Sequence, residues 1–293
     1  MIAKDGGYHL HQTYWTNLER LHSKDGDDVH GLCVAVNWPH RPHDVDLLLA
    51  LGHGFVARDT IGRPLGAGMW FDYENDAAMI GMMMTHPKLQ AGGLGREILA
   101  KIEATLAERH LRLNATGSAW RLYRSVGFRE TGSVVQYQGI VRSDVGVVST
   151  PEARIATHTD LPAITMLDKA LFGTERAQVL AQLFEASQVH VTMSAGQITG
   201  FAMCRPFGRG DLIGPLVAAC EDDAVTLARG FLQTHSGRFV RLDADARHKA
   251  LGGFLNAAGL KNYDTVVAMT RGTHFGPEAS DTQVYALASQ ALG

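Results

Sequence analysis

The sequence predicts an α/β protein of the α+β kind, built as two tandem copies of one domain, each with a mixed, mostly antiparallel central sheet flanked by helices. Three observations support this fold class. A strand-like run passes through a glycine-rich turn directly into an amphipathic helix, strand patterns separated by short polar turns form a meander, and this order recurs in the second half. With 293 residues the chain exceeds one typical domain, so about two are expected.

The composition is that of a globular protein whose positive and negative charges nearly balance. Hydrophobic residues make up 45% and charged residues 19%, with 27 basic against 30 acidic side chains, so neither nucleic acid nor a membrane is expected as a partner. Cys33, Cys204 and Cys220 lie far apart, which argues against a zinc site or a disulfide framework. Without an apolar signal core or a membrane-length run, a cytoplasmic protein is expected.

The first half is expected to begin with a helix and to continue through a meander. Residues 8–24 show helical spacing of apolar side chains, and a polar turn ends that segment. Asp44 is the expected N-cap of an apolar helix over residues 45–51. A helix follows the glycine-rich turn, because apolar residues from Leu94 to Leu106 recur on one face. The other expected elements are strands over residues 55–59, 65–73, 77–85, 111–115 and 130–141 and a short helix over residues 118–126.

The second half repeats these patterns in the same order. Ile80-Gly81 matches Ile213-Gly214, and Gly127-Phe128 matches Gly259-Leu260. A polar, turn-rich linker is expected over residues 143–151, and the alanine-rich residues 281–292 are expected to be a terminal helix or disordered. Two further pairs of segments match: Arg112-Leu-Asn-Ala115 with Arg241-Leu-Asp-Ala244, and Val134-Val135 with Val266-Val267. The second half is expected to form strands over residues 189–194, 198–206 and 211–218 and a helix over residues 224–232.

The glycine-rich turn, Gln90-Ala-Gly-Gly-Leu-Gly95, is the most informative stretch. The first N–H groups of the helix that follows have no partners within it and form the positive end of its dipole, so a backbone without Cβ atoms there can close around a pyrophosphate. A tight strand-to-helix connection is the alternative. No Gly-Lys-Ser/Thr follows, which excludes a P-loop, and the third glycine of a dinucleotide fingerprint would fall on Ile98.

Gln90-x-x-Gly93-x-Gly95, preceded by Pro87 and followed by Leu113-Asn-Ala-Thr116 and Leu122-Tyr-x-x-x-Gly-Phe128, resembles the GCN5-related N-acetyltransferases (the GNAT superfamily). Together with the repeat, the chain is similar to bacterial tandem-GNAT acetyltransferases with a diverged C-terminal copy, over roughly residues 8–272. The resemblance implies acetyl-CoA as co-substrate and no metal. The family often has Arg at the position of Gln90 and Arg or Lys at that of Gly92. The electrostatic attraction between this turn and coenzyme A is therefore expected to be weaker.

The resemblance also implies roles for particular residues. Tyr123 would be the general acid that protonates the leaving thiolate, with a packing tyrosine as the alternative. Arg96 would add charge at the pyrophosphate unless it is only a solvated helix residue, and Asn114 would either cap a bulge or contact the pantetheine arm. The implied coenzyme-binding residues are Met84, Thr85, Gln90, Ala91, Gly92, Gly93, Leu94, Gly95, Arg96 and Asn114.

The general base and the acceptor are less determined. His86, Glu74 and Asp72 are candidate bases, each with a surface or turn role as the alternative, and a chain of waters could replace them. His40 and His43 each follow a proline and have no third ligand nearby, which favours a surface turn or pocket wall over a metal site. An apolar acceptor pocket is expected from Met82, Met83, Met84, Trp70, Phe71 and Trp38, although core packing explains them equally well.

The sequence therefore predicts an N-acetyltransferase that moves an acetyl group from acetyl-CoA to a small-molecule amine by direct attack. The alternatives are a non-catalytic acyl-CoA-binding sensor or regulatory module and an enzyme that uses a longer acyl donor. A homodimer is left open. The second copy is expected to lack the coenzyme site, because Asp223 and Thr226 fall opposite Gln90 and Gly93, and Leu255 falls opposite Tyr123.

Overall fold

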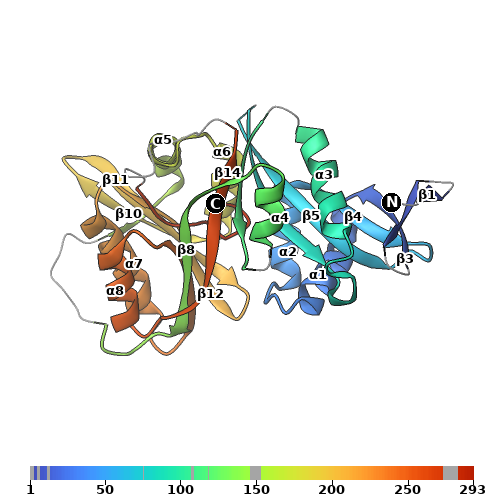
Figure 1. Cartoon of the computed structure of the whole chain (residues 1–293). Coiled ribbons are helices and arrows are strands. Elements are labelled where there is room, and N and C mark those ends of the chain that lie inside the picture. The colour runs from blue at the N-terminus through green and yellow to red at the C-terminus, as the bar shows by residue number, and fades with distance from the viewer. Residues whose placement is uncertain are drawn as a thin grey trace. The chain divides into compact units, whose positions relative to one another are not determined.

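The computed structural model describes residues 3–4, 7–11, 14–74, 76–106, 109–117, 119–145, 153–272 and 283–293 (Figure 1). The chain forms two compact units: unit 1 comprises residues 1–72 and 78–109, and unit 2 comprises residues 73–77 and 110–293. Each unit has its own sheet strands and helices, so the predicted α+β class is confirmed. Most of the expected linker, residues 146–151, and residues 273–282 of the expected tail lie outside the described residues.

Unit 1 is built on an antiparallel meander with helices beside it. The strands predicted over residues 55–59, 65–73 and 77–85 are confirmed as β4, β5 and β6. The strands, in sheet order, are β1 (Ala3–Lys4), β2 (Tyr8–His11), β3 (Tyr14–Arg20), β4 (His53–Asp59), β5 (Pro64–Tyr73) and β6 (Ala77–Thr85). The helices are α1 (Gly26–Ala35), α2 (Pro42–Leu51) and α3 (Leu94–Leu106).

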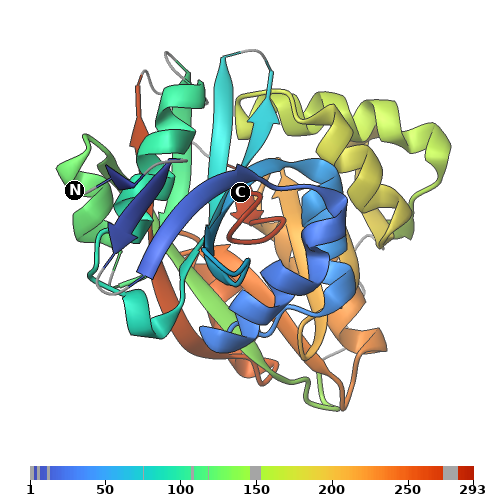
Figure 2. The same ribbon diagram turned by 90° about the vertical axis from the view of Figure 1, so that its right-hand side faces the viewer.

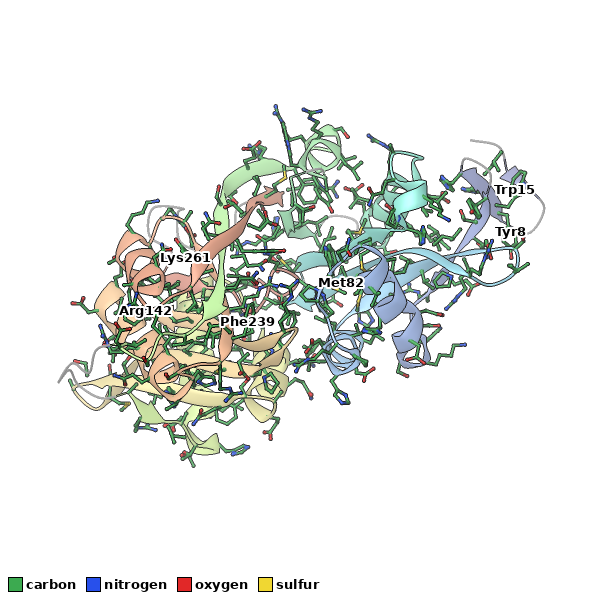
Figure 3. The ribbon with its side chains drawn as sticks, turned by 90° about the horizontal axis from the view of Figure 1, so that it is seen from below. Tyr8, Trp15, Met82, Arg142, Phe239 and Lys261 are labelled. Carbon is green, nitrogen blue, oxygen red and sulfur yellow. The ribbon has the colours of Figure 1, made fainter. Side chains whose placement is uncertain are left out.

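The expected helix over residues 8–24 is wrong, because this segment forms the strands β2 and β3. A spacing of four residues places side chains on one face of a helix, but it is also a multiple of two and so fits a strand. β3 pairs with β4, where Thr16 lies opposite Asp59, and this pairing with a distant segment supplies the backbone hydrogen bonds. Figure 3 labels Tyr8 on β2 and Trp15 on β3 at this edge of the sheet.

The starts of α1 and α2 also differ from expectation. A polar turn was expected to end the first segment, but Asp25 accepts a hydrogen bond from the His22 N–H at 2.8 Å, and α1 begins at Gly26. Asp44 is not the N-cap of α2: Arg41 is the cap residue, and Asp44 in the first turn accepts from the Arg41 N–H at 2.8 Å. In both cases a carboxylate satisfies an N–H before the helix, as in a capping box.

α3 covers unit 1 with the predicted apolar face. Its buried side chains are Leu94, Ile98, Leu99, Ile102 and Leu106. Gly68 of β5 permits the close approach, because a Cβ atom there would lie 2.7 Å from Ile98 Cγ2 and 2.4 Å from Met83 Sδ. The glycine therefore positions the helix, and with it the turn that precedes the helix.

Unit 2 contains the end of the first half and all of the second half. Its strands, in sheet order, are β7 (His110–Ala115), β14 (Lys261–Arg271), β8 (Arg129–Ile140), β13 (Phe239–Asp245), β15 (Val284–Ala286), β12 (Gly210–Ala218), β11 (Gln197–Phe207), β10 (Gln188–Ser194) and β9 (Arg154–Ile155). Its helices are α4 (Trp120–Ser125), α5 (Leu161–Phe172), α6 (Ala177–Glu185), α7 (Glu221–Thr234) and α8 (Lys249–Ala257). Each strand or helix predicted from residue 111 to residue 232 is confirmed to within a few residues at its ends.

The two halves exchange their last strands within unit 2. β14 pairs with both β7 and β8, and β8 pairs with both β14 and β13. Val134 and Val266, matched by the repeat, lie directly opposite each other in the antiparallel pair β8–β14. Figure 1 shows β8 and β14 side by side, and Figure 3 labels Phe239 and Lys261, the first residues of the two strands that flank β8. Each half thus completes its sheet with a strand from the other.

The end of the chain is neither a terminal helix nor disordered where it is described. β15 pairs with β12 and β13, and Val284, Tyr285 and Ala286 are buried. The hydroxyl group of Tyr73 donates to the Leu292 carbonyl, and Arg176 Nη1 donates to the Gly293 carbonyl at 2.8 Å. Alanine favours a helix by propensity, but pairing in a buried sheet overrides that preference.

Candidate functional site

The glycine-rich turn lies between β6 and α3 of unit 1 and has an unusual backbone. Gly93 has φ +94° and Ala91 has φ +63°, so two residues of the turn are in the left-handed region. That conformation is natural for Gly93 and uncommon for Ala91, which indicates a turn held by its surroundings. The side chain of Leu94 is buried and starts α3, while Gln90 and Ala91 are exposed.

The turn presents backbone donors at the N-terminus of α3. The Glu97 N–H donates to the Gly93 carbonyl at 3.1 Å and the Gly92 N–H to the Leu89 carbonyl at 3.2 Å. The N–H groups of Gly93, Leu94 and Gly95 donate to no oxygen atom of the described residues. Three donors at the positive end of a thirteen-residue helix are suited to a pyrophosphate.

The strand before the turn is irregular at its centre. Met82 has φ +51°, a left-handed backbone conformation in the middle of β6. A left-handed residue inside a strand marks a bulge, and such backbone strain concentrates at functional sites. Thr85 at the end of β6 lies beside the turn, because a Cβ atom on Gly95 would be 3.5 Å from Thr85 Cγ2. Met84 is buried, and its Sδ atom lies 3.6 Å from the thiol of Cys33.

Two histidines that were not among the predicted site residues lie at the turn and at the first turn of α3. His11 of β2 is buried, its Nδ1 atom lies 3.2 Å from the Gly92 carbonyl oxygen, and its Nε2 atom contacts Glu97 Oε2. His9 Nδ1 lies 2.6 Å from Glu97 Oε1, although not in line for a hydrogen bond. Figure 2 shows β2, in dark blue, next to α3. The contacts join residues far apart in the sequence, so only the His-x-His alternation could have indicated them.

Tyr123 and its surroundings lie in unit 2. α4 holds Tyr123, whose side chain is 5% exposed, and burial raises the pKa of its phenol. Its ring meets the Phe128 ring edge-on at 5.9 Å, and the Phe128 N–H donates to the Tyr123 carbonyl at 3.1 Å. Gly127, with φ +94°, makes the turn between α4 and β8. A phenol is protonated at neutral pH with or without this shift, so Tyr123 has a proton to donate, and the raised pKa makes it a weaker acid.

The side-chain amide of Asn114 in β7 forms a hydrogen bond with a residue near the C-terminus. Its Nδ2 atom donates to the Gln290 carbonyl at 2.9 Å, across a sequence separation of 176 residues. The strand alternates in burial, with Leu113 and Ala115 buried and Asn114 half-buried. The hydrogen bond supplies a partner for the amide, and its contact with a pantetheine arm stays a prediction.

The candidate bases each have partners. Asp72 in unit 1 pairs with Arg109 and lies 3.5 Å from His53 Nε2, and His86 Nδ1 accepts from the Lys88 N–H at 3.4 Å. Glu74 in unit 2 pairs with Lys169 at 2.9 Å, and the hydrogen bond from Lys169 lowers its pKa. A carboxylate with a lowered pKa is a weaker base, so Glu74 has the character of an ion-pair residue.

The residues expected to line an acceptor pocket are mainly core residues of unit 1. Phe71 is fully buried, and Trp70, Met82 and Met84 are each 3% exposed. Trp38 is half-buried and its ring lies 5.8 Å from that of His40, while the His43 side chain is 97% exposed at the start of α2. Within the described ranges, no group of three or more His, Cys, Asp or Glu side chains could hold a metal ion. None of the helices described is long and apolar enough to cross a membrane.

The second copy has no glycine-rich turn at the corresponding place. β12 ends at Ala218 and α7 begins at Glu221, with acidic side chains at positions 221, 222 and 223 in its first turn. Glu221 Oε1 accepts from the Leu251 N–H of α8 at 3.0 Å. Leu255, at the position of Tyr123, is fully buried, and Gly259 has φ +100°, as Gly127 has φ +94°.

Comparison with known proteins gives one family for both halves. Two sequence models, each described as an acetyltransferase (GNAT) domain, match residues 52–144 and residues 164–286. An uncharacterized N-acetyltransferase of Bacillus subtilis (strain 168), YitH, is 26% identical over 283 residues, which covers 94% of this chain and 98% of that protein.

Solved structures with the same fold span nearly the whole chain. A provisionally assigned acetyltransferase of Pyrococcus horikoshii has a TM-score of 0.76 at 19% identity, covering 97% of this chain and 99% of that one. A tandem GNAT protein from the clavulanic acid biosynthesis pathway has a TM-score of 0.62 at 15% identity, covering 87% of this chain and 98% of that one. At these identities the likeness establishes the fold alone.

Proposed function

The chain belongs to the GNAT superfamily of N-acetyltransferases, with two such domains in tandem, and on this premise we propose that it transfers an acetyl group from acetyl-CoA to the amine of a small molecule by direct attack. The observation that supports coenzyme binding most directly is the turn before α3, where the N–H groups of Gly93, Leu94 and Gly95 donate to no oxygen atom in the described part of the chain. Acyl-CoA use follows from the family; the acetyl group, the acceptor class and the residue roles are proposals.

We propose that the coenzyme binds mainly to the end of β6 and to the glycine-rich turn. The N–H groups of Gly93, Leu94 and Gly95 bind the pyrophosphate oxygens, and the positive end of the α3 dipole favours their charge. Arg96 adds a cationic side chain one residue later. The assigned coenzyme-binding residues are Met84, Thr85, Gln90, Ala91, Gly92, Gly93, Leu94, Gly95, Arg96 and Asn114.

We propose that Tyr123 donates the proton that the leaving sulfur requires. Acetyl-CoA supplies the thioester carbon that the neutral amine attacks, and the sulfur then leaves as a thiol once it receives a proton. The Tyr123 phenol is protonated at neutral pH, and burial raises its pKa further. The base is left to Asp72, His86 or solvent, since the ion pair with Lys169 lowers the pKa of Glu74.

We further propose a catalytic domain over residues 1–144, a diverged domain without a coenzyme turn over residues 151–272, and a tail over residues 273–293. The short connection from β12 to α7 and the acidic first turn of α7 support the absence of a second coenzyme site. Carboxylates at a helix N-terminus satisfy the dipole and repel a pyrophosphate. The second copy then has a structural role and does not bind the coenzyme.

Calorimetric titration of the full chain with acetyl-CoA, followed by a panel of amines with detection of free thiol, tests the proposal. We expect saturable binding and thiol release that depends on one class of amine. Binding without thiol release from any amine would favour the sensor, and stronger binding of longer acyl-CoA thioesters would favour another donor. Absence of acetyl-CoA binding would overturn the proposal.

A further inference from the structure

His11 holds the glycine-rich turn at a specific atom. The Gly92 carbonyl oxygen lies 3.2 Å from His11 Nδ1, and the other ring nitrogen, Nε2, contacts Glu97 Oε2 in the first turn of α3. The His11 side chain is only 2% exposed and that of Glu97 is 14% exposed, so both groups are largely shielded from water. A Cβ atom on Gly93 would have His11 Nδ1 as its nearest neighbour, at 3.8 Å.

The two ring nitrogens of His11 face different groups. A carbonyl oxygen can only accept a hydrogen bond, so the contact with Gly92 requires a hydrogen on His11 Nδ1. Nε2 faces the Glu97 carboxyl group, and the two side chains form a pair that is largely shielded from water. His9 Nδ1, 2.6 Å from the second oxygen of Glu97, adds a further contact from the same face of β2.

The same contacts act on the proposed phosphate donors in two ways. In a planar trans peptide the carbonyl and the following N–H point in opposite directions, so holding the Gly92 carbonyl toward His11 turns the Gly93 N–H to the other side. Glu97 is the acidic residue in the first turn of α3, where its charge would repel a pyrophosphate, and His11 covers that charge. No side chain from Gln90 to Gly95 is charged, so these effects are not duplicated there.

We propose that His11 is a positioning residue for the coenzyme: its Nδ1–H orients the Gly92–Gly93 peptide, and its Nε2 contact covers the Glu97 carboxyl group beside the pyrophosphate. This inference rests on the proposed function, since it specifies how the turn of that same site binds its ligand. It predicts that the contribution of His11 is confined to the part of the ligand that contains the phosphates.

Two substitutions separate the two contacts. His11→Asn keeps an amide nitrogen where Nδ1 lies and removes the contact with Glu97, whereas His11→Gln keeps a donor toward Glu97 and removes the one to Gly92. We expect each to raise the Kd of acetyl-CoA roughly tenfold by calorimetry, the usual effect of losing one charge-assisted hydrogen bond. Binding of acetyl-pantetheine, which has no pyrophosphate, should be unchanged by ligand-observed NMR.

A rescue and a matched control complete the test. Adding Glu97→Gln to His11→Asn removes the uncovered charge and should return the Kd to within about threefold of wild type. His158→Asn breaks an exposed His–Glu pair, between His158 Nε2 and Glu185 Oε1 at 2.9 Å in unit 2, and should leave the Kd unchanged. Thermal unfolding of each variant without ligand reports any loss of fold.

The outcomes distinguish this inference from the proposed function. If wild type binds acetyl-CoA and both His11 variants bind it equally well, His11 has no positioning role and the function stands. Equal losses for acetyl-CoA and acetyl-pantetheine, or no rescue by Glu97→Gln, would likewise overturn the inference, because they indicate general damage to the fold. If wild type binds no acetyl-CoA, the proposed function fails first and this inference fails with it.

Discussion

At the residue scale, Tyr123 combines burial with a position within a short helix. Burial raises the pKa of its phenol, and the Phe128 ring holds the tyrosine ring from one side. We predict that Tyr123→Phe lowers kcat roughly ten- to a thousandfold, the usual range for loss of a general acid, while the Kd of acetyl-CoA stays nearly constant. Turnover with the responsive amine and calorimetry on the same preparation measure the two quantities.

A second buried tyrosine provides the control for Tyr123. Tyr285 of β15 is 4% exposed, and burial raises its pKa to about 12, but it belongs to the copy without a glycine-rich turn. Tyr285→Phe should leave kcat unchanged. If Tyr123→Phe also retains full turnover at neutral pH, with chemistry shown to be rate-limiting, Tyr123 has no part in the reaction.

Gly93 is the residue of the turn for which a side chain is least compatible. Its φ of +94° strains any L-residue by about 1–3 kcal/mol, and a carboxylate there would oppose the pyrophosphate. We predict that Gly93→Glu weakens acetyl-CoA binding by roughly a hundredfold or more. Gly62→Glu, at φ +84° in the β4–β5 turn with open space around it, creates similar strain and should bind normally. Comparable binding by both variants would remove the turn from the coenzyme site.

Residue-scale features were predictable where the signal is local. Gly93, Gly95 and Tyr123 stand in spacings that resemble a known family, and the structure provides the left-handed turn and the buried phenol. His11 was not predictable in this way, because its contact with Gly92 joins positions 81 residues apart. Pairing between distant segments leaves no local pattern beyond the alternation of His9 and His11.

At the element scale, α4 depends on a strand from the second half. Arg271, the last residue of β14, donates from Nη1 to the Val126 carbonyl at 3.3 Å, and its guanidinium carbon lies 5.2 Å from the centre of the Phe128 ring. Its Cδ atom would be 3.6 Å from a Cβ atom on Gly127. Arg271 therefore covers the α4–β8 turn, next to the ring that holds Tyr123.

We predict that Arg271→Met lowers kcat roughly threefold to thirtyfold with little change in the Kd of acetyl-CoA. The substitution keeps the length of the side chain but removes a hydrogen bond and a cation–π contact, worth about 1–2 kcal/mol together. Arg229→Met removes a similar contact, at 4.6 Å over the Phe254 ring, and should leave kcat unaffected. If Arg271→Met has the same kcat as wild type, β14 does not position α4 for the reaction.

Element prediction failed at the two ends of the chain for a common reason. Residues 8–24 have a spacing that fits a helix or a strand, and residues 281–292 are rich in a helix-forming residue. Within the described parts of these segments, β3 forms because it pairs with β4, and β15 forms because it pairs with β12 and β13. The meander and α3 were predictable because neighbouring segments supply their partners.

At the scale of the whole molecule, the repeat predicted two copies but not their exchange of strands. Equivalent strands have equivalent patterns, so the sequence cannot distinguish β8 from β14 as the partner of β7. In the structure β14 lies between β7 and β8, and the Thr131 hydroxyl donates to the Ala268 carbonyl at 3.2 Å. The first half separated from the second would lose the strand between β7 and β8, so functional tests require the full chain.

The last prediction concerns stoichiometry: each chain binds one acetyl-CoA. Only the first copy has a left-handed glycine turn before its helix, whereas α7 follows β12 directly and begins with Glu221, Asp222 and Asp223. These carboxylates lie at the positive end of the α7 dipole, which favours their charge, and they would repel a pyrophosphate. Calorimetry on the full chain should give a ratio near one that Gly93→Glu abolishes. Two equivalent sites in wild type, or one site remaining in Gly93→Glu, would place coenzyme binding in the second copy as well and contradict its purely structural role.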